Sequence, residues 1–302
     1  MTATREVLDL LLRERILVLD GAMGTLVRQL GDKAADPGLV STVHHQYLEA
    51  GSDIIETHTF NGPPYEPSLE AARLAVRAAA DWTARTPHKP RFVAGVIGPV
   101  NRPAGDRQGA AGPVAPDDLR DAYVEQVRGL RDGGCDLLLV ETICDLRQAQ
   151  AALAAVAAVG NADGPSRRMP PVMLSVTVAE HGGRLPSGQT VQEFVASVEP
   201  ARPFAVGVNC AFGARRMGEV LEQLARTATM WVSCHPSAGL PDRQGRHPET
   251  PEETASFMRA WAEQGLVNIA GGCCGTTPAH IRAVATVLAG MPPRPCPAGQ
   301  RS

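Results

Sequence analysis

The chain has 302 residues, a length that fits one large domain or two small ones and leaves ample material for a hydrophobic core. Its 29 basic and 32 acidic residues give a net charge of −3, which argues against a protein that binds nucleic acid or an anionic membrane. No apolar run approaches the roughly 18 residues that a membrane-spanning helix needs. The chain has seven cysteines, an odd number, and its N-terminal segment is not typical of a secretion signal. We therefore expect free thiols in a reducing cytoplasm.

Eight short segments rich in Val, Ile, Leu and Ala have the near-continuous hydrophobicity of strands that are buried on both faces. They cover residues 16–20, 53–60, 91–98, 136–142, 171–178, 203–210, 230–236 and 266–274. Helical patterns cover residues 69–84, 117–133, 146–159, 190–198, 215–228, 250–264 and 277–288, and a short amphipathic helix is expected at the N-terminus.

This alternation predicts an α/β fold, a single-domain (β/α)8 TIM barrel. An open, doubly wound sheet is the alternative, but the turn after the first strand, Gly21–Gly24, lacks the GxGxxG pattern of a phosphate-binding loop. We expect the barrel to cover residues 1–290. Residues 291–302 contain four prolines and are expected to form a flexible tail.

Cysteines lie where two predicted strands end, at the edge where barrels of this type place their active sites. Glycines flank Cys273 and Cys274, so the backbone can turn and bring both sulfurs to one centre, and Cys210 can supply a third thiolate. Three thiolates with an open fourth position indicate a catalytic zinc site that activates a substrate thiol for alkyl transfer. The alternative is that Cys273 and Cys274 are buried packing residues or a redox pair.

Carboxylates and hydroxyls share this edge. Asp20 and Glu141 end strands and Glu56 lies in the second strand, where they can hold a substrate ammonium group. Asp20 is equally well explained as a helix cap, and Glu141 as the partner of an arginine. The segment Gly21–Thr25 offers backbone N–H groups for a carboxylate, and Thr57 offers a hydroxyl.

Several other polar residues have a simpler interpretation. His58 and His235 end strands, but a histidine in such a position is more often packed and hydrogen-bonded than functional. Cys135, Cys144 and Cys296 are interpreted as core or tail cysteines.

Motifs along most of the chain resemble those of the homocysteine S-methyltransferase family. They are LDGAMGT, IIETHTF, VAGVIGP, VETICD, SGQT, GVNCAFG and GGCCGTTP, and they lie between about Ile16 and Leu288. The segments WTARTPHKPRFVAGVIGPVNR and HPSAGLP are most similar to the homocysteine-binding module of cobalamin-dependent methionine synthases. The resemblance implies a zinc-dependent barrel that methylates the sulfur of L-homocysteine to give methionine.

The resemblance also implies roles for single residues. Cys210, Cys273 and Cys274 would hold one catalytic Zn²⁺, and Asp20 and Glu141 would hold the homocysteine ammonium group. Gly21, Ala22, Gly24, Thr25 and Thr57 would hold the rest of the amino-acid end. Two kinds of methyl donor stay open: methylcobalamin on a separate corrinoid- or folate-binding partner, or a small donor such as S-methylmethionine or betaine.

The chain departs from methionine synthases in ways that leave other functions open. Residues 25–37 and 61–69, expected as two loops over the site, form shorter segments than in those modules, and no DxHxxG cobalamin signature is present. His58 and Ser237 stand where that pattern usually has Asn. A second hypothesis is therefore a non-catalytic subunit that binds zinc or homocysteine in a larger methyltransferase complex. A third is a redox protein that uses Cys273 and Cys274.

Overall fold

The computed structural model describes residues 4–30, 36–62, 64–99, 116–162, 168–179 and 183–295. Its eight parallel strands form one sheet in the order β1-β8-β7-β6-β5-β4-β3-β2. A parallel bridge between Leu19 and Ile54 joins β1 to β2 and closes the sheet. The strands are β1 (Leu17–Val18), β2 (Ile54–Glu56), β3 (Phe92–Ile97), β4 (Leu137–Ile143), β5 (Val172–Val176), β6 (Ala205–Gly213), β7 (Trp231–Ser237) and β8 (Ile269–Ala270).

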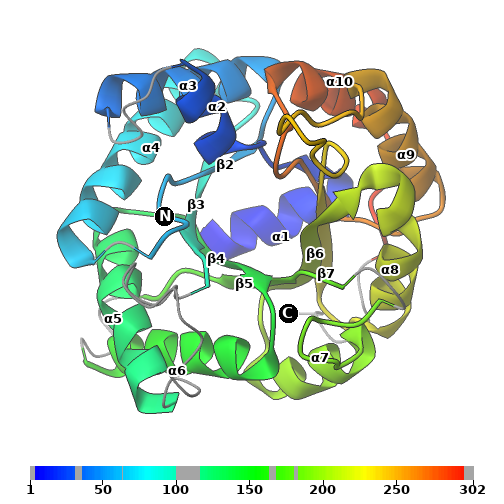
Figure 1. Cartoon of the computed structure of the whole chain (residues 1–302). Coiled ribbons are helices and arrows are strands. Elements are labelled where there is room, and N and C mark those ends of the chain that lie inside the picture. The colour runs from blue at the N-terminus through cyan, green and yellow to red at the C-terminus, as the bar shows by residue number, and fades with distance from the viewer. Residues whose placement is uncertain are drawn as a thin grey trace.

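Helices surround this sheet in a ring, which confirms the predicted (β/α)8 barrel (Figure 1). They are α1 (Thr4–Glu14), α2 (Met23–Leu30), α3 (Pro37–Ala50), α4 (Tyr65–Arg85), α5 (Pro116–Asp132), α6 (Leu146–Ala162), α7 (Val191–Val198), α8 (Ala214–Thr227), α9 (Pro251–Glu263) and α10 (Pro278–Leu288), with a 3-10 turn at Glu199–Ala201. Thr250 and Thr277 are the N-cap residues of α9 and α10.

The segment between β1 and β2 differs from the expectation, because it contains two helices that the hydrophobic pattern did not predict. Helix α3 starts after Asp36, whose side chain accepts a hydrogen bond from Gly38 N at 2.8 Å, and it ends at Gly51 with a φ of 113°. Residues 25–37 are therefore not a simple loop, since α2 occupies them up to Leu30. Likewise, α4 begins at Tyr65 and takes up much of the loop expected at 61–69.

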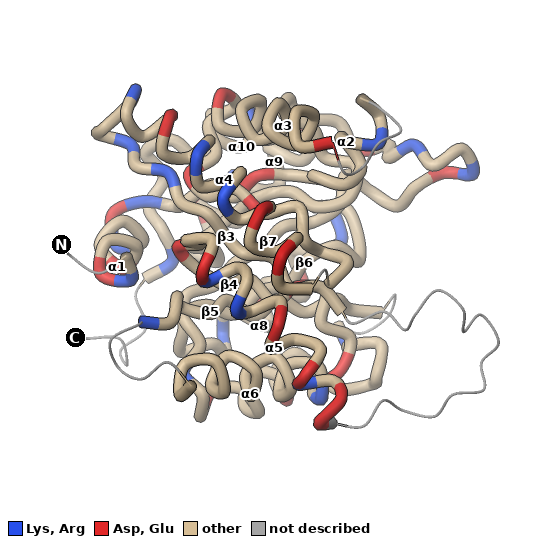
Figure 2. The backbone as a smooth tube through the Cα atoms, turned by 90° about the vertical axis from the view of Figure 1, so that its left-hand side faces the viewer, with Lys and Arg blue, Asp and Glu red and all other residues tan. Residues whose placement is uncertain are grey.

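The N-terminal helix α1 lies across one end of the barrel (Figures 1 and 2). Leu8 and Leu12 are fully buried in a cluster with the inward-facing side chains of all eight strands, Leu17 and Trp231 among them. The indole Nε1 of Trp231 donates a hydrogen bond to Asp9 Oδ1 at 2.7 Å. Because α1 covers the amino ends of the strands, their carboxyl ends remain at the opposite end of the barrel.

The expected tail is partly attached to the barrel. Its first residues, 291–295, are described, and Arg294 donates hydrogen bonds to the carbonyl oxygens of Ala225 and Ala228 at 2.8 and 2.6 Å. Residues 100–115, between β3 and α5, and residues 296–302 lie outside the described residues. In the described part of the chain no helix is long and apolar enough to cross a membrane.

The packing of α1 against the end of the barrel leads to a prediction about stability. Replacing Leu8 with Ala leaves a cavity under the barrel, so we expect the free energy of unfolding to fall by about 2–5 kcal/mol. The matched control is Leu10→Ala on the same helix, because Leu10 is 58% exposed and its loss should cost less than about 0.5 kcal/mol. Chemical denaturation of both variants checks this. Equal losses would contradict the packing of α1 as described.

Candidate active site

Three cysteine sulfurs meet at the carboxyl end of the barrel. The Sγ atoms of Cys210, Cys273 and Cys274 lie within 4.8 Å of one another, and that of Cys210 is 3.7 Å from that of Cys274. Cys210 comes from β6, and the adjacent pair follows β8. The structure thus brings together the three thiols that the sequence singled out, in a spacing that one metal ion can bridge.

An irregularity in β6 shapes the backbone at Cys210. The pairing of β6 with β7 shifts register between Cys210 and Gly213, and Cys210 and Ala211 have φ values of 58° and 42°. Left-handed conformations of this kind cost energy in non-glycine residues and concentrate at functional sites. A similar shift in β4 accompanies Thr142, whose φ is 57°.

Asn209 holds these two irregular strand ends together. Its Oδ1 accepts hydrogen bonds from Thr142 N at 3.0 Å and from Ser175 Oγ at 2.8 Å. Its Nδ2 donates to Thr142 Oγ1 at 2.9 Å and to Glu141 Oε2 at 3.2 Å. Asn209 was not among the residues predicted from the sequence, although its place directly before Cys210 was a usable signal.

The loop that carries Cys273 and Cys274 is fixed by neighbours on both sides. Cys273 N donates to Pro236 O at 2.8 Å, and Ala238 N donates to Cys274 O at 2.9 Å. Gly275 has a φ of 79°, and a Cβ there would lie 2.1 Å from the ring of His247. Only glycine fits this position, which explains the glycine after the cysteine pair.

Three buried carboxyls lie beside the thiols. Asp20, Glu56 and Glu141 are at most 9% exposed, and Asp20 Oδ2 accepts a hydrogen bond from Glu56 N at 3.0 Å. Asp20 Oδ1 and Glu56 Oε1 have no hydrogen-bond partner within the described residues. Neither Asp20 nor Glu141 has the structural role considered as an alternative: Asp20 bonds to a strand rather than a helix, and no arginine of the described chain pairs with Glu141.

Burial dominates the electrostatics of this group. It raises the pKa of Asp20 and Glu56, and it raises that of Glu141 to about 8, with a smaller contribution from Cys210. Burial also lowers the pKa of His235 to about 4, so this histidine is neutral. Its Nδ1 lies 3.9 Å from Glu141 Oε2. A bound cation would relieve the carboxyls, because each would then ionise next to a positive charge.

The turn after β1 is tied to the cysteine loop. Ala22 N donates to Thr276 Oγ1 at 3.1 Å, so this N–H is not free to bind a substrate carboxylate as expected. Tyr47 Oη bonds to Ala22 O and to Thr276 O, at 3.2 Å each, and Thr276 Oγ1 donates to Cys273 O at 2.7 Å. Gly24 and Thr25 lie in the first turn of α2, where N–H groups have no partner inside the helix.

Thr57 and His58, two residues considered from the sequence, both have surroundings that limit a role in binding. The hydroxyl of Thr57 contacts Thr59 Oγ1 at 2.7 Å and accepts from Val96 N at 2.9 Å. Thr59 Oγ1 donates its own hydrogen to Val96 O. Thr57 Oγ1 is therefore the donor in the bond between the two hydroxyls, and it is not available to donate to a substrate. His58 is half-buried, and its pKa is lowered by burial and by the charge of Arg28.

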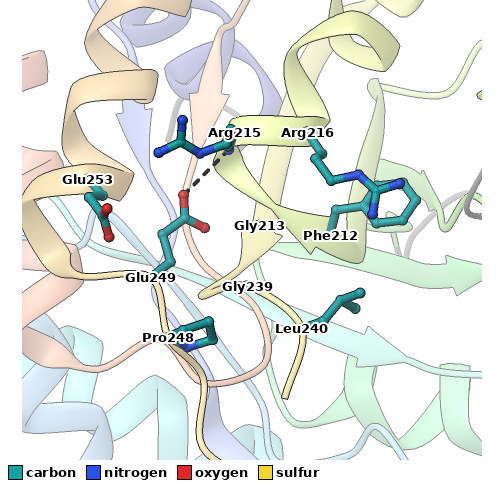
Figure 3. A pocket seen from close by; sticks show the side chains of 9 residues that line it. All are labelled: Phe212, Gly213, Arg215, Arg216, Gly239, Leu240, Pro248, Glu249 and Glu253. Atoms are coloured by element: carbon teal, nitrogen blue, oxygen red, sulfur yellow. Dashed lines mark hydrogen bonds between the residues drawn. The ribbon is translucent and has the colours of Figure 1, made fainter. Parts of the chain in front are cut away.

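Two hollows flank the thiols. A cavity of about 490 Å³ contains Cys210, Cys274 and Ser237 and extends to Thr25, Arg28, Gln29 and His247. A neighbouring pocket is lined by Phe212, Arg215, Arg216, Leu240, Glu249 and Glu253 (Figure 3). In that pocket Glu249 accepts hydrogen bonds from Ala214 N and Arg215 N at the start of α8, which anchors the chain just after Cys210.

The fold and the site define a class: a TIM barrel with a thiol cluster beside buried carboxyls at the carboxyl ends of its strands. The model of the homocysteine S-methyltransferase family matches residues 17–288. The chain therefore belongs to the homocysteine S-methyltransferase family, which confirms the resemblance noted in the sequence.

Solved structures give the same fold. The metallated form of the homocysteine methyltransferase MmuM from Escherichia coli matches with a TM-score of 0.76 and 22% identity over 92% of this chain and 98% of that chain. Its apo form matches with a TM-score of 0.70 and 24% identity over 91% and 97%. A ribulose-1,5-bisphosphate carboxylase/oxygenase from Pyrococcus horikoshii shares only the barrel, with a TM-score of 0.55 and 11% identity over 95% and 62%.

The raised pKa of Glu141 predicts a pH-dependent stability in the metal-free, reduced protein. Its carboxyl ionises near 4.5 when unfolded and near 8 when folded, so its stabilising effect is complete below about 4.5 and is lost as the pH rises towards about 8. Glu141→Gln should remove up to about 1.4 kcal/mol per pH unit of this decline. Urea unfolding across this range measures it, with exposed Glu252→Gln as the control. Identical slopes for the Glu141 variant and wild type would contradict the assignment.

Proposed function

We propose that this protein is a zinc-dependent methyltransferase that transfers a methyl group to the sulfur of L-homocysteine and produces methionine. The observation that carries the proposal is the placement of three thiols beside three buried carboxyls at one end of the barrel. The thiols suit a metal that binds a substrate sulfur, and the carboxyls suit the ammonium group of an amino acid. The barrel of residues 1–290 would act as the homocysteine-binding unit.

The donor set fits zinc. In the absence of metal, hydrogen bonds from Cys273 and Cys274 hold the pKa of Cys210 well below its ordinary value. The hydrogen bond to Cys210 is also the main reason that the pKa of Cys273 is raised and that of Cys274 reaches about 11. Three simultaneous thiolates therefore need a cation, and thiolate ligands favour zinc over the harder divalent ions. When bound, zinc would lower the pKa of the homocysteine thiol and keep its sulfur nucleophilic.

A second group also has the spacing of metal ligands. One ligand atom each from Glu56, Glu141 and His235 lies within 4.8 Å of the others. We assign this group to the ammonium of homocysteine, because Asp20 adjoins it and supplies a further carboxylate oxygen without a partner in the described chain. An ammonium group has three N–H donors, which these carboxylates can accept.

The chain's own residues would orient homocysteine for the reaction. Asp20, Glu56 and Glu141 would orient the amino-acid end, and the N–H groups of Gly24 and Thr25, which lie in the first turn of α2, would be available to its carboxylate. The homocysteine sulfur forms the new carbon–sulfur bond with the methyl group. The bond between the methyl group and its donor breaks, the leaving group keeps that electron pair, and the thiol proton goes to solvent.

The metal assignment is tested with Cys273→Ser. This variant should lose most of its zinc and nearly all methyl transfer but keep its fold, because the barrel core does not include this side chain. Cys144→Ser is the control, since Cys144 is a partly buried thiol outside the cluster. Elemental analysis measures the zinc content of each protein. In wild type, X-ray absorption at the zinc edge should find about three sulfur ligands per zinc, and about four with homocysteine. Full zinc content in Cys273→Ser would refute the site.

The ammonium assignment is tested with Asp20→Asn. Loss of one buried charge should raise KM for homocysteine by roughly tenfold or more, because charge-assisted hydrogen bonds contribute about 1.5–3 kcal/mol. Zinc content should not change. Steady-state kinetics at saturating donor separate the two substrates, and an unaltered KM for homocysteine would mean that Asp20 is purely structural.

A further inference from the structure

One face of α2 turns towards the thiols. Thr25, Arg28 and Gln29 are three and four residues apart, so they lie on the same side of the helix, and all three line the cavity that contains Cys210 and Cys274. The opposite face packs into the core through Met23 and Val27. The position of Arg28 over the cavity is therefore set by the burial of this helix.

Arg28 is the one arginine or lysine among the described residues that line this cavity, and no Asp or Glu is among them. It is exposed, and no ion pair or hydrogen bond joins its side chain to another described residue. Its charge nevertheless acts locally, because it contributes to the lowered pKa of His58. Among the described residues none occupies its five N–H donors, so these can serve a ligand.

Unlike Arg28, Arg215 and Arg216 of the neighbouring pocket have partners among the described residues (Figure 3). Arg216 lies over the ring of Phe212, 4.2 Å from its centroid, and Arg215 lies 5.3 Å from the centroid of Phe257. Glu249 and Glu253 line the same pocket and balance their charge. Carboxylates therefore accompany the arginines of the adjoining pocket, whereas no Asp or Glu of the described chain lines the cavity beside Arg28.

We infer that Arg28 binds an oxyanion of the methyl donor and so selects which donors this enzyme accepts. The inference rests on the proposed function, because it requires a methyl acceptor at the thiols. Of the groups assigned to the acceptor's amino-acid end, only Thr25 is part of the cavity wall and the three carboxyls are not, so most of the wall is left for the second substrate. A volume of about 490 Å³ is that of a small-molecule pocket.

The oxyanion can belong to two donor types. In a small zwitterionic donor such as S-methylmethionine or betaine it is the carboxylate, at the other end of the molecule from the methyl group. In a corrinoid it is the phosphodiester. The planar guanidinium pairs with either group through two parallel hydrogen bonds.

The test compares Arg28→Gln with Arg243→Gln. Arg243 is an exposed arginine that does not line the cavity, so both variants lose one positive charge near the site. Calorimetry with S-methylmethionine measures binding without turnover, and trimethylsulfonium is the matched probe without a carboxylate. We expect Arg28→Gln to weaken binding of S-methylmethionine by roughly tenfold and to leave trimethylsulfonium and homocysteine unaffected. Added salt should weaken binding to wild type more than to Arg28→Gln.

Each outcome separates this inference from the proposed function. If S-methylmethionine does not bind but turnover with methylcobalamin falls roughly tenfold in Arg28→Gln alone, the oxyanion is the phosphodiester and the inference stands. Equal effects of both variants on every donor would overturn it, and so would weaker homocysteine binding in Arg28→Gln. Failure of wild type to bind or use any of these donors would also overturn it. The zinc content of Cys273→Ser tests the metal site independently.

Discussion

Six acidic side chains, three thiols and three carboxyls, share one small volume at the carboxyl end of this barrel. Burial opposes their ionisation, and mutual repulsion adds to that cost, so the site cannot be fully charged without cations. A metal at the thiols and an ammonium group at the carboxyls would satisfy this demand separately. The site thus has two electrostatic halves, and on the proposed function one would hold the sulfur of homocysteine and the other its amino-acid end.

The positions of these groups depend on hydrogen bonds from residues that carry no charge. Asn209 joins the ends of β4 and β6, and Thr276 with Tyr47 joins the turn after β1 to the cysteine loop. The bonds of Asn209 hold the left-handed residue Thr142 in place, in a conformation that persists only where its surroundings determine it. Site geometry here is a property of four strand ends and not of one motif.

Local hydrophobic patterns were enough to predict the strands of this protein but not all of its helices. Buried parallel strands are nearly continuous apolar runs, so all eight were visible, and their number and alternation with helices indicated a barrel. The helix α3 was missed because its hydrophobic pattern is weak, although Asp36, Pro37 and Gly51 mark both of its ends. The cluster of thiols was predictable because glycine and cysteine chemistry limits what the GGCCG segment can do.

Other features needed the tertiary structure, since they depend on contacts between distant segments. The N–H of Ala22 and the hydroxyl of Thr57 looked available in sequence, but Thr276 and Thr59 occupy them. Likewise, only the structure shows that Arg28, far from Cys210 in the sequence, lines the thiol cavity with no carboxylate beside it among the described residues. The sequence by itself determined the barrel, the family and the residue types of the site, because these follow from local patterns. The tertiary structure decided which polar groups remain free, because hydrogen-bond partners are set by how strand ends meet in space.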